Sequence, residues 1–137
     1  MAEFHMNDPF CSVNSVDLSD HVVSVELAYG SETLDVTAGG DAVRNFIAGL
    51  KTITCSVTFN QDFAASKTYI TLYSLVGAAG TAVSIGADAT ASISATNPRF
   101  NFTAFPSSLP LVTGAVGSAM QISVPFIGQT DITVATS

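Results

Sequence analysis

The chain has 137 residues, and only 11% of them are charged, with 11 acids against four bases and a net charge of −7. Four scattered Lys and Arg residues cannot neutralise a run of phosphates, so the composition excludes a protein that grips nucleic acid. The sequence has no run of 18 apolar residues, and we expect no transmembrane helix. A weakly charged surface rich in small residues favours association with other protein surfaces.

The N-terminal "MAEFHMNDPF" has neither the basic region nor the apolar region of a signal peptide. We interpret residues 1–5 as a cloning remnant and expect Met6 to be the natural start, with residues 6–137 forming one domain. Two cysteines, Cys11 and Cys55, do not make a disulfide framework. We expect Cys55 to be a buried thiol, with a disulfide to Cys11 as the alternative.

The first strand signals lie in "VNSVDLSDHVVSVELAY". Apolar residues at 23, 25 and 27 alternate with residues 24, 26 and 28, which predicts a strand. A shorter strand at 12–17 precedes it. Asp17 and Asp20 in "DLSDH" are typical of a turn between the two strands, and calcium binding is the weaker alternative because no third acid lies close by.

The segment "GSETLDVTAGGDAVRNFIAGL", residues 30–50, breaks the regular alternation. It is longer than the loops that compact domains usually carry, and its apolar residues argue against disorder. Such a segment is too apolar to stay in water and has no obvious place in its own domain. We therefore interpret it as an arm that packs on another subunit, with a long floppy hairpin as the alternative.

The segment "KTITCSVTF", residues 51–59, has strict alternation. Ile53, Cys55, Val57 and Phe59 are expected on one buried face of a strand. The other face carries small hydroxyl residues and, after Lys51, no charge. A surface of this kind suits contact with a neighbouring subunit or a narrow channel better than open water.

A change of period predicts a helix over residues 62–76. Ala65, Tyr69, Leu72 and Val76 have the i, i+4, i+7, i+11 spacing of an amphipathic helix. Asn60 or Asp62 can cap its start, and Gly77 can end it. β-branched residues weaken the helix propensity, so a strand is the alternative.

The rest of the chain predicts strands at 81–86, 89–95, 97–105, 118–126 and 130–136, the first two forming a hairpin around "GADA". Pro125 indicates an edge or the end of strand pairing. Seven or eight strands, one helix and the arm predict a mainly β protein. We expect a β-sandwich or barrel with one flanking α-helix and a long Gly-rich arm.

No catalytic motif accompanies this fold. The sequence has no P-loop, dinucleotide-binding glycine pattern, HExxH or GxSxG. His21 and Cys55 would act together only if they converged, and a thiolate on an apolar face is disfavoured. We therefore expect no enzyme activity, no cofactor and no metal.

Four stretches carry a resemblance to a known family: "VDLSDHVVSVEL", "LDVTAGGDAVRNFIAGLKTITCSVTFNQDF", "SATNPRFNFTAF" and "TGAVGSAMQISVPFIGQTDITVATS". Together they resemble the major tail proteins, or tail tube proteins, of long-tailed bacteriophages, especially those of actinobacteria. The resemblance covers nearly all of residues 12–137. The most specific parts are the block from Asp35 to Lys51 and the final "GQTDITVATS".

The resemblance implies a virion structural protein of the tail that self-assembles into hexameric rings. In this family, strands of neighbouring subunits join one inner barrel, the rings stack, and viral DNA passes through the lumen without specific binding. The implied partners are further copies of the chain and other tail proteins, with no membrane contact, and assembly takes place in the host bacterial cytoplasm. The alternatives are a capsid decoration protein, a tail terminator, or a host- or carbohydrate-binding β module.

The resemblance also indicates which residues would act in assembly. The arm at 30–50 would bridge stacked rings, with apolar contacts from Phe46 and Ile47 and an ion pair from Arg44; packing of the two apolar residues into the subunit's own core is the alternative. The expected assembly residues are Glu32, Leu34, Asp35, Val36, Asp41, Arg44, Phe46 and Ile47. The candidate lumen-facing acids are Glu26, Asp88 and Asp131.

Overall fold

A computed structural model describes residues 6–64 and 67–136. These residues form eight strands, one short α-helix and one 3₁₀ turn. The helical elements are η1 (Ser19–His21) and α1 (Thr68–Tyr73). The strands are β1 (Phe10–Val13), β2 (Val16–Asp17), β3 (Val22–Asp35), β4 (Phe46–Asn60), β5 (Thr81–Gly86), β6 (Arg99–Pro106), β7 (Gln121–Gly128) and β8 (Thr133–Ala135).

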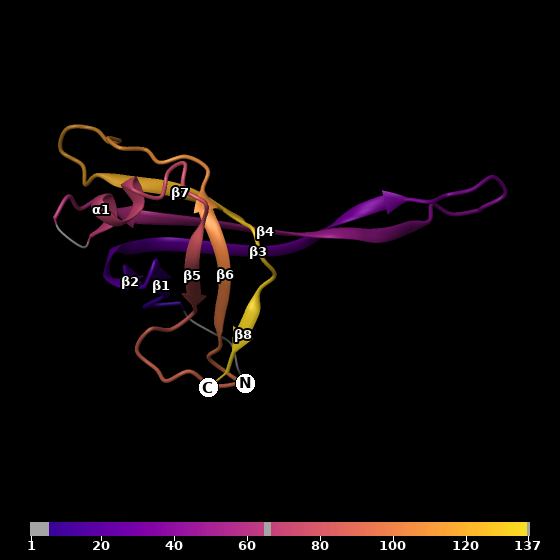
Figure 1. Cartoon of the computed structure of the whole chain (residues 1–137), viewed down its shortest axis with the longest axis horizontal. Coiled ribbons are helices and arrows are strands. Elements are labelled where there is room, and N and C mark those ends of the chain that lie inside the picture. Colours follow the sequence, from indigo (N-terminus) through magenta and orange to yellow (C-terminus); the bar gives the residue numbers. More distant parts are fainter. Residues whose placement is uncertain (1–5, 65–66, 137) are drawn as a thin grey trace.

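All eight strands belong to one sheet in the order β2-β1-β5-β6-β7-β4-β3, and β8 pairs with β6 beside this path. Every pairing is antiparallel. The sheet folds over on itself, so that β5 and β6 run across β3, β4 and β7 (Figure 1). This crossing of two halves encloses a core between their inner faces. The mainly β fold with one lone helix is confirmed.

The core follows the alternation of β4. Ile53, Cys55, Val57 and Phe59 are buried, while Thr52, Thr54 and Ser56 are exposed. Burial contributes about 1.5–3 kcal/mol for each of the larger side chains. The same alternation holds in β7, where Ile122, Val124 and Phe126 are buried. The predicted inner faces of these two strands are therefore confirmed.

Pro125 lies where the pairing of β7 with β6 ends. The last registered pair of these strands is Pro106 with Phe126, and the Ser107 amide then donates to the Pro125 carbonyl over 2.9 Å. On its other side Pro125 stands opposite Ser56 of β4. The absence of an N–H at residue 125 therefore coincides with the end of pairing, as its sequence position predicted.

The helix is much shorter than the predicted 62–76. It spans Thr68–Tyr73, and its N-cap residue Lys67 makes no side-chain capping bond. The Thr68 hydroxyl donates to Gln61 Oε1 over 2.8 Å, and the Asp62 carboxylate accepts from the Ala64 amide instead of capping the helix. The buried residues are Thr68, Thr71, Leu72 and Leu75, whereas Val76 of the predicted stripe is exposed and Ala65 lies outside the described residues. The helix therefore spans less than two turns.

Residues 89–95 do not form the predicted strand. β5 pairs with β1 on one side and β6 on the other, which leaves no edge for a hairpin partner. The buried Asn97 amide instead reaches the carbonyls of Asp88, Ala91 and Ser92, each at 3.2 Å. Side-chain bonds to the backbone of this kind favour a compact loop over a ladder.

Both cysteines are buried free thiols. A disulfide between Cys11 and Cys55, the alternative that the sequence left open, is therefore not formed. The "DLSDH" segment is a turn as predicted, because Asp17 Oδ1 accepts hydrogen bonds from the amide and the hydroxyl of Ser19 at 2.9 and 2.6 Å. In the described ranges, no helix has the length and hydropathy that a membrane span requires.

Candidate assembly surfaces

The arm is the continuation of β3 and β4 beyond the body of the domain. The two strands stay paired from Ser31–Lys51 out to Asp35–Phe46, and the hairpin projects along the longest axis of the molecule (Figure 1). Residues 30–50 are all described, and none of them is buried. The arm is therefore a two-stranded hairpin whose strands are joined by residues 36–45.

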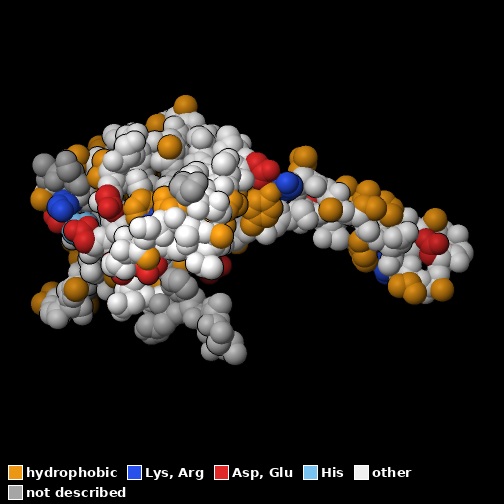
Figure 2. Space-filling model, turned by 90° about the horizontal axis from the view of Figure 1, so that it is seen from below, with side chains coloured by type: hydrophobic (Ala, Val, Ile, Leu, Met, Phe, Trp, Pro, Cys, Tyr) orange, Lys and Arg blue, Asp and Glu red, His pale blue; other side chains and the backbone are white. Residues whose placement is uncertain are grey.

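Apolar side chains lie on both faces of this ribbon. Leu34 stands opposite Ile47, and Phe46 stands opposite Asp35 at the next register position, so the two sets point to opposite faces. Phe46 and Ile47 are 51% and 52% exposed and lie outside the core cluster. Figure 2 shows hydrophobic side chains along the arm on the face turned to the viewer. Packing into the subunit's own core, the alternative use of these side chains, does not occur.

Polar side chains close the end of the arm. The Thr37 amide donates to Asp35 Oδ1 over 2.9 Å, and Arg44 forms an ion pair with the same carboxylate at 2.6 Å. Hydrogen bonds from Thr37, with a smaller contribution from Arg44, hold the pKa of Asp35 below its ordinary value. Asp41 accepts from the Ala38 amide at 2.8 Å, and Gly40 has a φ of 95°, which favours glycine. In the isolated subunit these predicted assembly residues therefore shape the hairpin end.

The arm begins at a β-bulge. Gly49 and Leu50 of β4 stand between two registered pairs that enclose only Glu32 on β3. Glu32 Oε2 accepts a hydrogen bond from the Leu50 amide at 3.4 Å. A side chain at position 49 would meet Glu32, since a Cβ there would lie 2.8 Å from Oε2. Bulges bend and twist a strand pair, so this one sets the direction of the arm.

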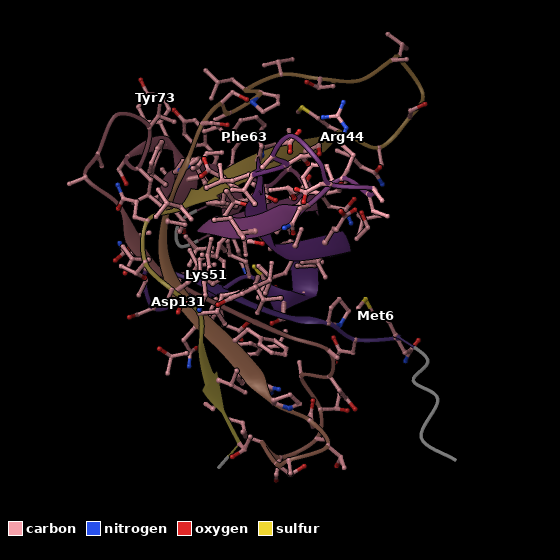
Figure 3. All side chains as sticks on the ribbon, turned by 90° about the vertical axis from the view of Figure 1, so that its right-hand side faces the viewer. Met6, Arg44, Lys51, Phe63, Tyr73 and Asp131 are labelled. Carbon is pink, nitrogen blue, oxygen red and sulfur yellow. The ribbon has the colours of Figure 1, made fainter. Side chains whose placement is uncertain are left out.

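Three polar side chains hold the base of the arm to the β7–β8 connection (Figure 3). Tyr29 donates its hydroxyl to Asp131 Oδ1 over 2.6 Å, and Lys51 Nζ lies 3.3 Å from Oδ2. Lys51 also stands 5.6 Å from the centroid of the Tyr29 ring. Hydrogen bonds from Tyr29 and then Lys51 lower the pKa of Asp131. The sequence did not reveal this cluster, because its members lie 102 and 80 residues apart.

The hydroxyl face of β4 continues across its two neighbours. Registered positions on β3 and β7 bring small or uncharged residues beside Thr52, Thr54, Ser56 and Thr58. Glu26 is the one charged residue at these positions. The flanking residues are Ser24, Glu26, Ala28 and Gly30 on β3 and Gln121, Ser123, Pro125 and Ile127 on β7. We call this outer surface of β3, β4 and β7 the hydroxyl face. At these registered positions it carries one carboxylate, that of Glu26, and no base.

The three candidate lumen acids do not share one surface. Glu26 lies on the hydroxyl face, opposite Ser56. Asp131 contacts Tyr29, whose register partner is the buried Ile53, so Asp131 lies on the other side of the β3–β4 ribbon. Asp88 lies in the loop after β5, where hydrogen bonds from the Thr90 hydroxyl and amide lower its pKa.

β3 is also an edge strand. Within the described residues it pairs with β4 alone, so its other side offers backbone donors and acceptors over the whole of Val22–Asp35. Proteins that stay monomeric usually shorten, charge or cover such an edge. A long unprotected edge is a template for pairing with another chain.

A second apolar surface lies at the end of the molecule opposite the arm (Figure 1). Here α1 and the turn that follows it meet the loop between β6 and β7. Tyr73, Val76, Leu109 and Leu111 line a groove of about 290 Å³. Phe63 and Ile70 are exposed as well. The Tyr69 ring makes tilted contacts with the rings of Phe63 and Tyr73, with centroids 5.3 and 5.4 Å apart. We call Phe63, Ile70, Tyr73, Val76, Leu109 and Leu111 the helix–loop surface.

Cys55 and His21 are the two residues that the sequence offered as a nucleophile and its base. Burial raises the pKa of the Cys55 thiol to about 12, which disfavours the thiolate. The acceptors nearest to His21 Nε2 are the carboxylates of Asp62 and Asp20, at 3.6 and 3.8 Å. Among the described residues, no group of three or more His, Cys, Asp or Glu side chains could hold a metal ion.

Comparison with known proteins identifies the fold. No family model and no curated protein sequence matches the chain. A chain in the virion of a native gene transfer agent particle is 8% identical with a TM-score of 0.75, and the match covers 97% of this chain and 99% of that one. A chain of the SPP1 tail tube is 11% identical with a TM-score of 0.73, covering 98% and 80%. A chain from the tail of an empty gene transfer agent particle, refined with C6 symmetry, is 11% identical with a TM-score of 0.65, covering 85% and 83%.

These neighbours are components of virions and tail tubes. The chain therefore has the fold of phage tail tube proteins, and its structural neighbours are structural proteins rather than enzymes. At such low identity the likeness defines the fold, and the role of this chain is argued from its own surfaces below.

Proposed function

We propose that the chain is the structural subunit of a bacteriophage tail tube, which self-assembles into stacked hexameric rings around a channel for viral DNA. The observation that carries the proposal is the arm. A ribbon without a single buried residue, apolar on both faces, extends from a domain with the tail tube fold. Exposed apolar residues gathered on one segment are typical of a surface that contacts another protein.

The hydroxyl face of β3, β4 and β7 is the proposed wall of the channel. Joining the free edge of β3 to a neighbouring subunit extends this face around a ring and removes the exposed edge. Phosphates passing such a wall meet one carboxylate per subunit, Glu26, and no base that would hold them. DNA would therefore slide through during ejection, and we retain Glu26 as the lumen-facing acid.

The arm residues supply the contacts between rings. Leu34, Val36, Phe46 and Ile47 provide apolar contact, and Arg44, which is 73% exposed, forms its ion pair with Asp35 of the same arm. Glu32, Asp35 and Asp41 hold the arm in the shape that makes these contacts. The proposed location is the tail of the virion, with other tail proteins as further partners and assembly in the host cytoplasm. An origin in an actinobacterial phage rests on the sequence resemblance.

Electron microscopy of the purified protein tests this proposal. We expect long hollow tubes or stacks of six-fold rings at high protein concentration, or on addition of short tube fragments as seeds. Single rings that never stack would instead indicate a tail terminator. Monomers that neither polymerise nor extend any seed would contradict the tube proposal and favour a capsid decoration protein or a binding module.

A further inference from the structure

We propose that the arm of one subunit docks on the helix–loop surface of a second copy of this chain. The inference rests on the proposed function and adds the place where the arm binds. The first observation is where the two surfaces lie. The arm and the helix–loop surface lie at opposite ends of the longest axis, at about the same height in Figure 1. In the view down that axis, the labelled Arg44 of the arm and Phe63 of the helix–loop surface both lie in the upper half (Figure 3).

This placement has a geometric consequence. Moving a copy along its own long axis by the length of the body brings its arm to the helix–loop surface of the copy ahead. A contact between two different surfaces of identical chains forms a ring when its rotation closes and a filament when it does not. Because this displacement is a translation along the long axis, it continues as a filament. Stacked rings of a tube require this kind of contact in the axial direction.

The helix–loop surface carries little charge that would repel an acidic arm. Residues 30–50 contain three acids, Glu32, Asp35 and Asp41, against one base, Arg44, so the arm has a net charge of −2. Residues 67–80 and 107–120 contain one charged residue, Lys67, which lies 3.7 Å from Asp20, and no acid. The acid nearest in sequence to a member of the surface is Asp62, which precedes Phe63. In a protein with a net charge of −7, most surfaces repel an acidic arm. The segments that form most of the helix–loop surface do not.

Both surfaces also need cover. Tyr73, Val76 and Ile70 are about half exposed around a groove lined by Leu109 and Leu111, and the arm has half-exposed apolar side chains along its length. Placing Phe46, Ile47 or Val43 against this groove removes apolar area from water on both partners at once. A cleft of about 440 Å³ beneath β3, lined by Val25, Leu27, Phe100 and Val134 among others, is the rival binding place. Strands of the body line this cleft, and α1 contributes no residue to it.

Cross-linking between engineered cysteines tests the contact. The double variant Val43→Cys/Leu111→Cys places one thiol near the end of the arm and one in the groove, and Val43→Cys/Val134→Cys is the matched control for the rival cleft. Each single variant is a second control. The native thiols will not interfere, because Cys11 and Cys55 are 0% and 2% exposed. Assembled protein is treated with a short bis-maleimide, resolved on a denaturing gel, and imaged in parallel.

We expect a ladder of covalent oligomers from Val43→Cys/Leu111→Cys, and at most dimers from the single variants and the Val134 control. Tubes in the images with no ladder, or with a ladder only from the Val134 pair, would overturn the docking site and leave the tube proposal intact. Failure of the wild-type chain to assemble, with or without seeds, would overturn both.

Discussion

The body and the arm share the same two strands but differ in what holds them. In the body, β4 lies between β3 and β7 and buries every second side chain from Ile53 to Phe59. In the arm the same pair of strands has no third neighbour and buries nothing of its own. The body therefore stabilises itself, whereas the arm keeps its apolar residues for contacts that the isolated subunit cannot make. Variants in the two regions should fail in different ways.

The largest expected effect is on folding. Phe59→Ala removes a fully buried ring and should lower the free energy of unfolding by about 3–5 kcal/mol. The matched variant Phe46→Ala removes the same atoms from the arm and should change that free energy by no more than about 0.5 kcal/mol. Chemical denaturation of both variants measures the difference. Equal losses would mean that the arm shares in the core.

Assembly should reverse this order. Phe46→Ala should raise the protein concentration needed for tube growth by about 10- to 100-fold, because covering such a ring contributes about 1.5–3 kcal/mol. Ile93→Ala, which truncates an exposed apolar residue in the loop after β5, should leave that concentration unchanged. Sedimentation of tubes over a protein concentration series gives both values. A comparable effect from Ile93→Ala would argue against a specific role of the arm.

Charge reversal separates the channel wall from the arm. Glu26→Lys places a base on the hydroxyl face, and Glu32→Lys places one at the start of the arm. We expect tubes of Glu26→Lys to retain DNA at low salt and release it as salt rises, because phosphates then have counter-charges along the wall. Tubes of Glu32→Lys, where they form, should not retain DNA. Binding of DNA by neither variant would remove Glu26 from the lumen.

The junction of arm and body should respond to acid. The pKa of Asp131 is lowered in the folded protein, so its contacts with Tyr29 and Lys51 are present above the ordinary carboxyl value of 3.8 and are lost as the pH falls through the lowered pKa. At neutral pH, Asp131→Asn should exchange backbone hydrogens at the base of β3 and β4 faster than the wild type. The protection that the wild type loses when Asp131 is protonated should already be absent in this variant. Asp88→Asn, whose pKa is lowered by a local turn, is the control and should not alter exchange at the base.

The smallest effect is chemical. Burial raises the pKa of both native thiols, that of Cys55 to about 12, so neither should react with a thiol reagent at pH 8 until the protein unfolds. Val43→Cys in the arm should react at once, because that position is 77% exposed. Rapid labelling of native Cys55 would show that the body opens as readily as the arm.

Local periodicity predicted the body well. The alternation in residues 51–59 placed the inner face of β4 correctly, and "TAVSIG" matches β5 residue for residue. Local periodicity gave wrong predictions where contacts with distant segments determine the structure. Residues 89–95 have strand composition, but both edges of β5 are occupied. The predicted helical stripe is right at Leu72, which is buried, and wrong at Val76, which is exposed.

The arm was predicted as a segment but not as a structure. The sequence favoured an arm that packs on another subunit, with a long hairpin as the alternative, and in the structure β3 and β4 pair as a hairpin from Ser31–Lys51 to Asp35–Phe46. The reason is that Gly49 accommodates the bulge against Glu32 and Gly40 takes the left-handed conformation at the turn. The Tyr29–Lys51–Asp131 cluster left no sequence signal, because only the folded sheet brings the β7–β8 connection to the base of the arm.

The uninterrupted course of β4 from the core to the arm has a mechanical consequence. A pull on the arm along the long axis cannot peel β4 from β7 one residue at a time. It must slide one strand past the other, and the seven registered pairs from Thr54–Ile127 to Asn60–Gln121 resist that sliding together. Tension between subunits would thus be transmitted to the centre of each domain in the direction in which a ladder of hydrogen bonds is hardest to break.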